Sequence, residues 1–261
     1  MGVRPGVSPS ARATVFPPAI PRPAAAVKAK SSAPTKLWAA IFWTAILFVY
    51  TYTLWLMLRI VLQYTSLRPD VAFLEIKQDY IDIPGYRLAF FTHVFSSGFV
   101  LLAAYSQFSA KLRRIPGLHK WLGRLYAYIV IFLAGPTGLF IGFFANGGIS
   151  SRIAFCLLAV LWVSFTILAL LKMRARQVQD HARWMVRSYA LALSAITLRA
   201  WKVAIIALFH PHPMDVYRIV AWLGWVGNLI AAELLILYLF RRRARPTPKT
   251  RAQLLPTEVH L

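Results

Sequence analysis

The sequence predicts an all-α, polytopic membrane protein with six transmembrane helices. Its 261 residues are 59% hydrophobic and only 15% charged, which is more apolar and less charged than an ordinary soluble domain. Six apolar runs each approach the roughly 20 residues with which a helix crosses ~30 Å of hydrocarbon. They are residues 38–58, 88–108, 125–145, 153–171, 188–209 and 217–240.

The segments outside these runs each have an expected structure. Residues 1–36 are rich in proline and lack apolar clusters, so we expect a disordered tail. This tail is longer than the start of a usual signal peptide, and the first apolar run is therefore expected to remain as a membrane anchor. The long loop 62–87 is predicted to form a small interfacial cap. Residues 37–240 then make one transmembrane domain, and residues 241–261 a second basic tail.

Basic residues give the chain a net charge of +22 and also predict its orientation. They concentrate in the two tails and in the loops that follow the second and fourth apolar runs. Because cytoplasmic loops carry an excess of Lys and Arg, both termini are predicted to be cytoplasmic. No known nucleic-acid-binding module accompanies the charge, so we expect no nucleic-acid partner. Attraction of the basic tails to anionic lipid is expected instead.

A short motif occurs twice. HKWLGRLYA at residues 119–127 and HARWMVRSYA at residues 181–190 share His, then Trp-x-x-Arg-x-Tyr-Ala. The third and fifth spans could begin inside these motifs, a few residues earlier than the apolar runs. Since the helices on either side match in order and orientation, the motif predicts a core of two duplicated hairpins, helices two to five. Convergence on a good interfacial entry sequence is the alternative.

The motif histidines are candidate haem ligands. Cys156 is the only cysteine, which excludes disulfides, thiolate zinc sites, iron–sulfur clusters and c-type haem within one chain. His119 and His181 occupy corresponding places in the two hairpins, where they could ligate a b-type haem, with Arg124 or Arg187 available to its propionates. The alternative is that these residues only cap and orient the hairpins at the membrane interface.

A second candidate site lies in the outer half of the membrane. Arg199 is ~18 Å along the fifth helix from Arg187, and His93 is ~9 Å below the outer end of the second helix, so the two are expected at similar depth. We expect a pocket in which His93 exchanges a proton and Arg199 holds an anionic or carbonyl group. Ser97 and Asn228, on polar or small-residue stripes of neighbouring helices, are further candidates. A structural hydrogen bond with snorkelling of Arg199 is the alternative.

The remaining polar residues predict less. Glu233 is the only acid inside a span and is expected to form an ion pair with Arg124 or Arg187. The loop HPHPMD contains His210, His212 and Asp215, but its two prolines offer little preorganisation, and no metal site is predicted. No catalytic triad, phosphate loop or dinucleotide fingerprint is present.

Four segments resemble a known family: HVFSSGFVLLAAYSQF, LHKWLGRLYAYIV, AGPTGLFIGFFANGG and HARWMVRSYALALSAITLRAWK. The chain is similar over about residues 88–202, and on through PMDVYRIVAWLGW, to the bacterial predicted membrane proteins called domain of unknown function 2306. The resemblance implies a helical bundle in the bacterial cytoplasmic (inner) membrane and no established reaction. Lys120 departs from the arginine more usual there. The implied motif positions are His93, His119, Arg124, His181, Trp184, Arg187 and Arg199.

These features favour a membrane redox protein that binds haem b or a quinone. Haem would use His119 and His181, and a quinone or other small ligand would use His93 and Arg199. A non-redox transporter or binding protein for a small solute, with a polar inner face, is the main alternative, and a structural membrane subunit is the third. Whether the chain is an enzyme stays open at this point.

Overall fold

A computed structural model of the chain describes residues 2, 33–108, 112–115 and 117–244. The predicted tails, residues 1–36 and 241–261, therefore lie largely outside the described residues. The chain divides into two units. The first, residues 1–46, contributes only the start of the first helix to the description, and the second, residues 47–261, contains everything discussed below.

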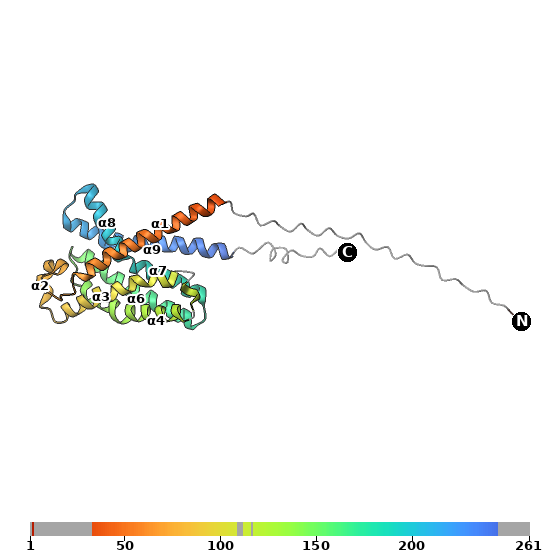
Figure 1. Ribbon diagram of the computed structural model, residues 1–261. Coiled ribbons are helices and arrows are strands. Elements are labelled where there is room, and N and C mark those ends of the chain that lie inside the picture. The colour runs from red at the N-terminus through yellow and green to blue at the C-terminus, as the bar shows by residue number, and fades with distance from the viewer. Residues whose placement is uncertain (1, 3–32, 109–111, 116, 245–261) are drawn as a thin grey trace. The chain divides into compact units, whose positions relative to one another are not determined.

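The described residues are helical, with no strand among them, as the sequence predicts. Two short segments, η1 (Ala72–Lys77) and α2 (Gln78–Ile81), form the cap expected after the first span. The long elements, coloured along the chain in Figure 1, are α1 (Ala33–Leu62), α3 (Tyr86–Phe108), α4 (Leu118–Tyr128), the π-helical η3 (Ile129–Ala134), α5 (Gly135–Gly142), α6 (Ile149–Arg174), α7 (Val178–Ala192), α8 (Ser194–Phe209) and α9 (Pro213–Ala244), with a short η2 (Leu112–Arg114) between α3 and α4.

Four helical segments of the described chain are long and apolar enough to cross a membrane, or five if α7 and α8 count as one broken span. They are residues 40–62, 118–142, 149–174 and 213–239. The apolar part of α3, Tyr86–Leu102, is shorter. The second predicted span, 88–108, and with it a total of six spans, therefore stays a prediction. The helices of the third and fifth predicted spans begin earlier than the apolar runs, as expected, but just before the repeated motifs and not inside them, at Leu118 and Val178.

The fifth predicted span, 188–209, is not one unbroken helix, so the prediction of a continuous helix there is wrong. The chain bends by 43° between α7 and α8. At the bend, Asn228 Nδ2 of α9 donates to the carbonyl of Ala190 at 3.0 Å, the carbonyl that a regular helix would pair with the amide of Ser194. Insertion of a side chain into the helical hydrogen-bond ladder is a recognised cause of a kink. Asn228 also donates to Thr197 Oγ1 at 3.0 Å, which ties both sides of the bend to α9.

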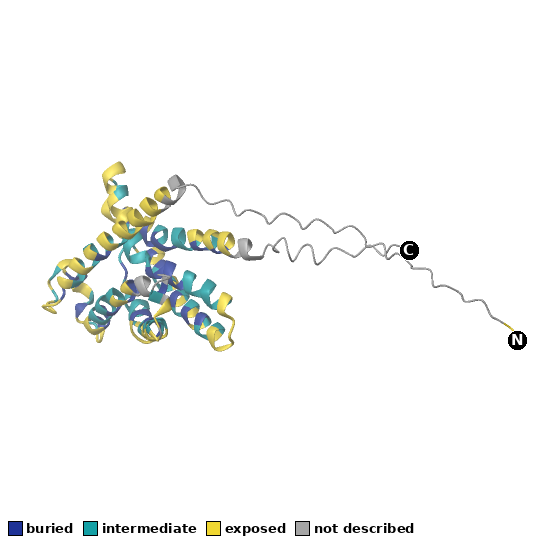
Figure 2. Ribbon diagram, turned by 45° about the vertical axis from the view of Figure 1, so that its right-hand side comes forward, coloured by how far each residue is buried: buried dark blue, intermediate teal, exposed yellow. Residues whose placement is uncertain are grey.

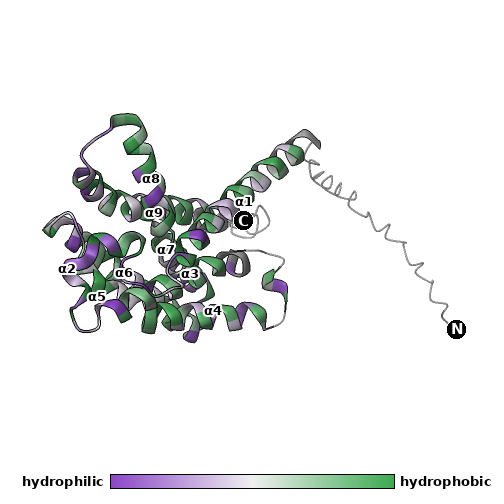
Figure 3. Ribbon diagram, turned by 60° about the vertical axis from the view of Figure 1, so that its left-hand side comes forward, coloured by the Kyte–Doolittle hydropathy of each residue, from purple (hydrophilic) through white to green (hydrophobic). Residues whose placement is uncertain are grey.

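The two helix hairpins, α3–α4 and α6–α7, close into a four-helix core (Figure 1). α3 contacts α4 and α7, and α6 contacts the same two helices. The helices of the hairpins bury their facing sides and leave the outward sides exposed (Figure 2). Those outward sides are largely apolar, whereas hydrophilic segments gather toward loops and helix ends (Figure 3), as expected of helices surrounded by lipid.

The tyrosines of the repeated motif meet in the centre of this core. Tyr126 of α4 and Tyr189 of α7 are 2% and 6% exposed, and their ring centroids are 6.3 Å apart. The motif alanines that follow them, Ala127 and Ala190, are also buried. The repeat therefore has a packing role in both hairpins, and a core of two duplicated hairpins stays a prediction.

A closed ring of hydrogen bonds locks α4, α6 and α7 together. The Trp162 indole donates to the Tyr126 hydroxyl at 3.3 Å, and the Thr166 hydroxyl donates to the Trp162 carbonyl at 2.8 Å. Because the Thr166 proton is used there, Ser188 must donate to Thr166, and Tyr126 to Ser188, both at 2.7 Å. Each hydroxyl in the ring both donates and accepts, and the last one donates to the backbone carbonyl of Trp162, where the ring closes. Because no donor in it is left unused, the ring serves to hold the three helices together.

A second lock joins α1 and α7 to α3. The Tyr189 hydroxyl donates to the Leu101 carbonyl at 2.8 Å. The Tyr50 hydroxyl of α1 reaches the same carbonyl at 2.5 Å and also contacts the Tyr189 hydroxyl. Tyrosine side chains of two helices, α1 and α7, thus converge on one backbone oxygen of a third, α3.

The closed ring makes a testable prediction. Tyr126→Phe leaves the Trp162 indole N–H without an acceptor and the Ser188 hydroxyl without its donor, and we expect it to lower the free energy of unfolding by about 1–3 kcal/mol. Thermal unfolding in mild detergent measures the change. The control, Tyr128→Phe, removes the hydroxyl of a tyrosine that is 59% exposed and is expected to leave stability unchanged. Equal effects of the two variants would show that the ring adds nothing.

Candidate functional site

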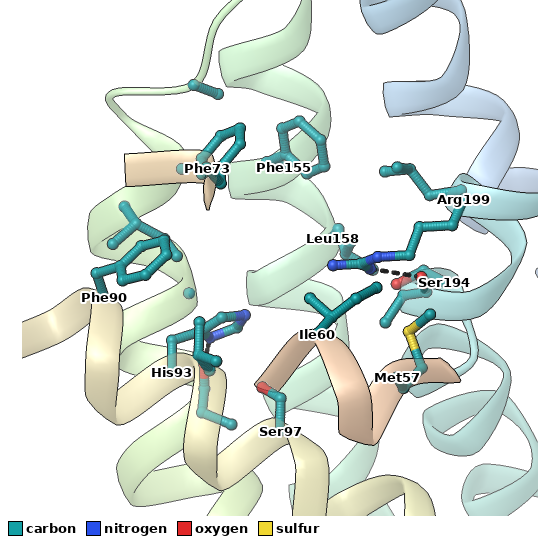
Figure 4. A pocket seen from close by; sticks show the side chains of 18 of the residues that line it. Met57, Ile60, Phe73, Phe90, His93, Ser97, Phe155, Leu158, Ser194 and Arg199 are labelled. Atoms are coloured by element: carbon teal, nitrogen blue, oxygen red, sulfur yellow. Dashed lines mark hydrogen bonds between the residues drawn. The ribbon is translucent and has the colours of Figure 1, made fainter. Parts of the chain in front are cut away.

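A cavity of about 660 Å³ lies between the four-helix core, α8 and the cap. Its walls are mostly apolar and include Phe90, Phe155 and Trp162. Met57, Ile60 and Val61 of α1 close one side, and residues of the cap close another. Polar side chains enter from α3 and α8, and Figure 4 shows His93 and Ser97 on one side of the space with Arg199 extending toward them from the other.

An irregular helical turn in the third span holds the His93 side chain in position. Pro136 has no amide proton, and its ring would clash with the carbonyl four residues earlier in an α-helix. The chain here is π-helical, and the Gly135 amide reaches back to the carbonyl of Val130. At the end of this segment the carbonyl of Ala134 accepts a hydrogen bond from His93 Nδ1 at 2.8 Å. Since a carbonyl can only accept, Nδ1 carries the proton, and Nε2 is left for the cavity.

Gly138 provides the room for the imidazole. A Cβ at this position would lie 2.8 Å from Cε1 and 3.0 Å from Nδ1 of His93, closer than side-chain atoms pack. Gly135 is equally tight against α6, where its Cβ would lie 2.2 Å from Val163 Cγ2. The glycines of the segment AGPTG therefore let α3 and α6 approach the third span closely, and the close approach on α3 holds His93 in place.

Ser97 lies one turn along α3 from His93. Its hydroxyl oxygen is buried and has no hydrogen-bond partner among the described residues, although the residue lines the cavity. A buried hydroxyl without a partner costs about 1–3 kcal/mol, so this atom favours a ligand or water in the cavity.

Arg199 brings a cation into the same space. Its Nη1 donates to the carbonyl of Ala195, on its own helix, at 2.7 Å. It has no ion pair with any described residue, and Lys202, one turn further along α8, also lines the cavity. No described acid lines the cavity. A cation inside a membrane bundle usually faces a partner, a cavity or a ligand, and Arg199 faces the cavity.

Lys77 of the cap lines the end of the cavity next to the cap. It is 2% exposed, and its ammonium group donates to the carbonyl of Phe144 and to Asn146 Oδ1. The ring centroids of Phe73 and Tyr80 are 5.6 and 5.0 Å away, within the range of cation–π contacts. Burial, and then the positive charge of Arg152, lower the pKa of Lys77 to about 8. All of its contacts are neutral, so the cap is held by an ammonium group without a counter-ion among the described residues.

The structure brings together three of the four residues predicted for the pocket. His93, Ser97 and Arg199 line the cavity, whereas Asn228 does not and instead binds the bend between α7 and α8. Among the residues proposed for haem, His181 donates from Nδ1 to the carbonyl of Ala169 on α6 at 2.9 Å. That bond fixes the turn of the second hairpin.

The other residues proposed for haem lie outside the cavity lining. Gln107 of α3 donates to the backbone carbonyl of His119 at 3.4 Å. Arg187 forms a two-point ion pair with Glu233, one N···O distance being 2.8 Å, which confirms one of the two partners predicted for that acid. Arg124 is exposed. No group of three or more His, Cys, Asp or Glu that could hold a metal occurs in the described part of the chain.

Sequence reasoning missed the contributions of Lys77, Gly138 and the Ala134 carbonyl. Gly-Pro inside an apolar run signals an irregular helix, but which side chain uses the freed space depends on the neighbouring helix. Lys77 belongs to an amphipathic loop and gives no sign in the sequence that it turns inward.

Residues 90–236 match the model of a family described as predicted membrane protein (DUF2306). The chain belongs to this family. Neither a curated protein nor a solved structure matches the chain. The part that matches the DUF2306 model contains His93, Ser97 and Arg199 but not α1 or the cap with Lys77. The polar groups of the cavity core thus lie within the family domain, and two of its walls come from segments outside it.

The close contact between Gly138 and the His93 imidazole can be tested with Gly138→Ala. The added methyl group would strike the imidazole, so we expect the hydrogen bond to Ala134 to break and stability to fall by about 1–3 kcal/mol. In a His93→Ala background the same substitution should cost much less, because the ring is gone. Thermal unfolding of the four proteins of this cycle measures the coupling. Gly227→Ala, where nothing lies within 4 Å, is the control, and additive effects at 93 and 138 would contradict the contact.

The buried ammonium of Lys77 predicts a pH dependence. Its pKa is about 8 in the folded chain and 10.5 ordinarily, so above pH 8 the unfolded state binds more protons and stability rises with pH until about 10.5. From pH 7 to 9.5 the wild type should gain about 2 kcal/mol relative to Lys77→Met. Unfolding in a neutral detergent and phosphate-free buffer measures this difference. Parallel pH profiles of the two proteins would mean that the ammonium is not buried.

Proposed function

We propose that the protein is a membrane redox protein that binds a quinone in the cavity described above. The observation that supports this proposal is the set of unused polar groups on otherwise apolar walls. His93 Nε2 and Ser97 Oγ lack partners among the described residues, and Arg199 donates hydrogen bonds only to its own helix. Ligand sites typically combine apolar walls with a few such orienting groups.

The chemistry of a quinone head suits these groups. A quinone carries two carbonyl oxygens on opposite sides of a flat ring, and Arg199 can donate to one of them. His93 can donate from Nε2 to the other when it is protonated, and can accept from a quinol hydroxyl when it is neutral. His93 would therefore give or take the proton that accompanies reduction or oxidation at that oxygen. The aromatic side chains Phe90, Phe155 and Trp162 offer faces for the ring.

Electrons must come from a redox partner, and the proposal assigns that role to a b-type haem. His119 and His181 would be its ligands, and Arg124 is the better-placed partner for a propionate because Arg187 is engaged by Glu233. In this proposal the membrane is the bacterial cytoplasmic membrane, both termini are cytoplasmic, and six spans place the cap outside, as the basic loops favour.

The charge of the cavity supports a second candidate function, binding or transport of a small anionic solute. Arg199, Lys202 and Lys77 all line the cavity, and no described acid does. An electropositive cleft with low-dielectric walls attracts anions. This candidate needs no redox partner, so the two functions are separable by experiment.

Quinone binding is tested on the full chain purified in mild detergent. A short-chain quinone should bind, as measured by isothermal titration calorimetry, and His93→Leu and Arg199→Gln should each weaken binding about tenfold or more, since each removes a hydrogen bond to the head. Arg59→Gln and His210→Leu change an arginine and a histidine outside the cavity lining and should leave binding unchanged.

Unchanged binding in both cavity variants would refute this site. If no quinone binds, uptake of small anions into proteoliposomes that depends on Arg199 would support the second function instead. The same preparation tests the haem. A Soret band that is lost in His119→Ala and in His181→Ala supports the ligation, and a preparation from haem-replete cells without a Soret band rejects it.

A further inference from the structure

The outer end of α6 has backbone donors without acceptors. The helix begins at Ile149, after two glycines with positive φ, Gly147 (83°) and Gly148 (81°). Gly148 at the N-cap offers no side-chain cap, and the amides of residues 149–151 have no acceptor among the described residues. α6 is 26 residues long, so its N-terminus carries a substantial positive dipole. Such an end attracts an anion, but by itself it does not specify one.

Two side chains of the same turn also lack partners. Ser151 is fully buried, and its hydroxyl has no hydrogen-bond partner among the described residues. This hydroxyl points back at the glycine turn, where a Cβ on Gly147 would lie 2.5 Å from it. The Nε of Arg152, the next residue, is buried and equally without a partner in the described chain. These donors stand at the start of the helix, beside its open amides.

Lys77 adds a second cation at this end. It is bound to the turn that precedes α6, through the carbonyl of Phe144 and the side chain of Asn146. It lies near enough to Arg152 for the two charges to repel. Neither forms an ion pair with a described acid. Two like charges held together with unused donors are unfavourable unless an anion joins them.

We propose that the outer end of α6 binds a phosphate group between Lys77, Arg152 and the first amides of the helix. Phosphate offers several acceptor oxygens in one compact anion, which matches a guanidinium, an ammonium and a helix N-terminus. This site uses neither His93 nor Arg199, so its test is independent of the quinone proposal, although Lys77 also lines the cavity.

The surroundings favour the phosphate of an anionic lipid. Ile149 and Ile153, on the first two turns of α6, are 73% and 50% exposed, which provides an apolar path for an acyl chain. The indole of Trp222 donates to Ser150 Oγ at 3.0 Å, and tryptophan is typical of the headgroup level of a membrane. Free inorganic phosphate has the same head chemistry and is the other source to be tested.

The test measures thermal unfolding of the full chain in neutral detergent. Phosphatidylglycerol at about a hundredfold excess over its Kd should raise Tm by about 5 °C or more, whereas phosphatidylcholine, whose headgroup is zwitterionic, should raise it far less. Inorganic phosphate is the third arm. A rise with phosphatidylglycerol alone supports a lipid site, and a rise with both anions supports a phosphate site open to either source.

Substitutions test whether the lipid-induced rise in Tm comes from binding at Lys77 and Arg152. Arg152→Gln removes a charge whose Nε makes no hydrogen bond in the described chain, so it should fold and lose at least half of the lipid-induced rise in Tm. Lys77→Met should do the same if it folds. Arg59→Gln changes an exposed cation of α1 near the same end of the bundle and should keep the full effect. An equal response to the two lipids, or a full response in Arg152→Gln, would overturn the proposal.

Discussion

The structure depends on one constraint, that a polar group placed among apolar helices in lipid must find its partner inside the protein. The ring of Trp162, Tyr126, Ser188 and Thr166 meets this constraint completely, because every hydroxyl both donates and accepts. It joins one helix of the first hairpin to both helices of the second. The constraint thus converts a few polar residues into the fixed geometry of the four-helix core.

The same constraint explains why the cavity lies where it does. Two helices depart from regular geometry, at the π turn before Pro136 and at the bend after Ala192, and at each a side chain from another helix donates to a backbone carbonyl. His93 binds the Ala134 carbonyl at the first, and Asn228 binds the Ala190 carbonyl at the second. Ala134 beside the first departure, and Ala192 and Ser194 beside the second, line the cavity that Arg199 enters.

Much of this arrangement follows from the sequence, but the direction in which two polar side chains, Asn228 and Lys77, point does not. Apolar length and the repeated motif predict the helices and their order. A lone acid in a span predicts an ion pair of Glu233 with Arg124 or Arg187, and the structure shows the pair with Arg187. Matching depth along two helices predicts His93 and Arg199 near one level. Asn228 shares their polarity, but only the rotation of α9 determines that it binds a carbonyl. Lys77 turns inward because of how the cap folds, which local composition does not encode.

Polar atoms that the fold leaves without partners then indicate where other molecules belong. In the described chain these include Ser97 on the cavity wall, and Ser151 and Arg152 at the N-terminus of α6. The Trp225 indole is a further one, enclosed in the apolar core, and nothing in the structure explains it. The other three stand beside cations that lack acids, Arg199 in the cavity and Lys77 at the rim. Apart from the Trp225 indole, unsatisfied donors beside unpaired cations are better explained by ligands than by poor packing, because native structures rarely leave buried polar groups without partners.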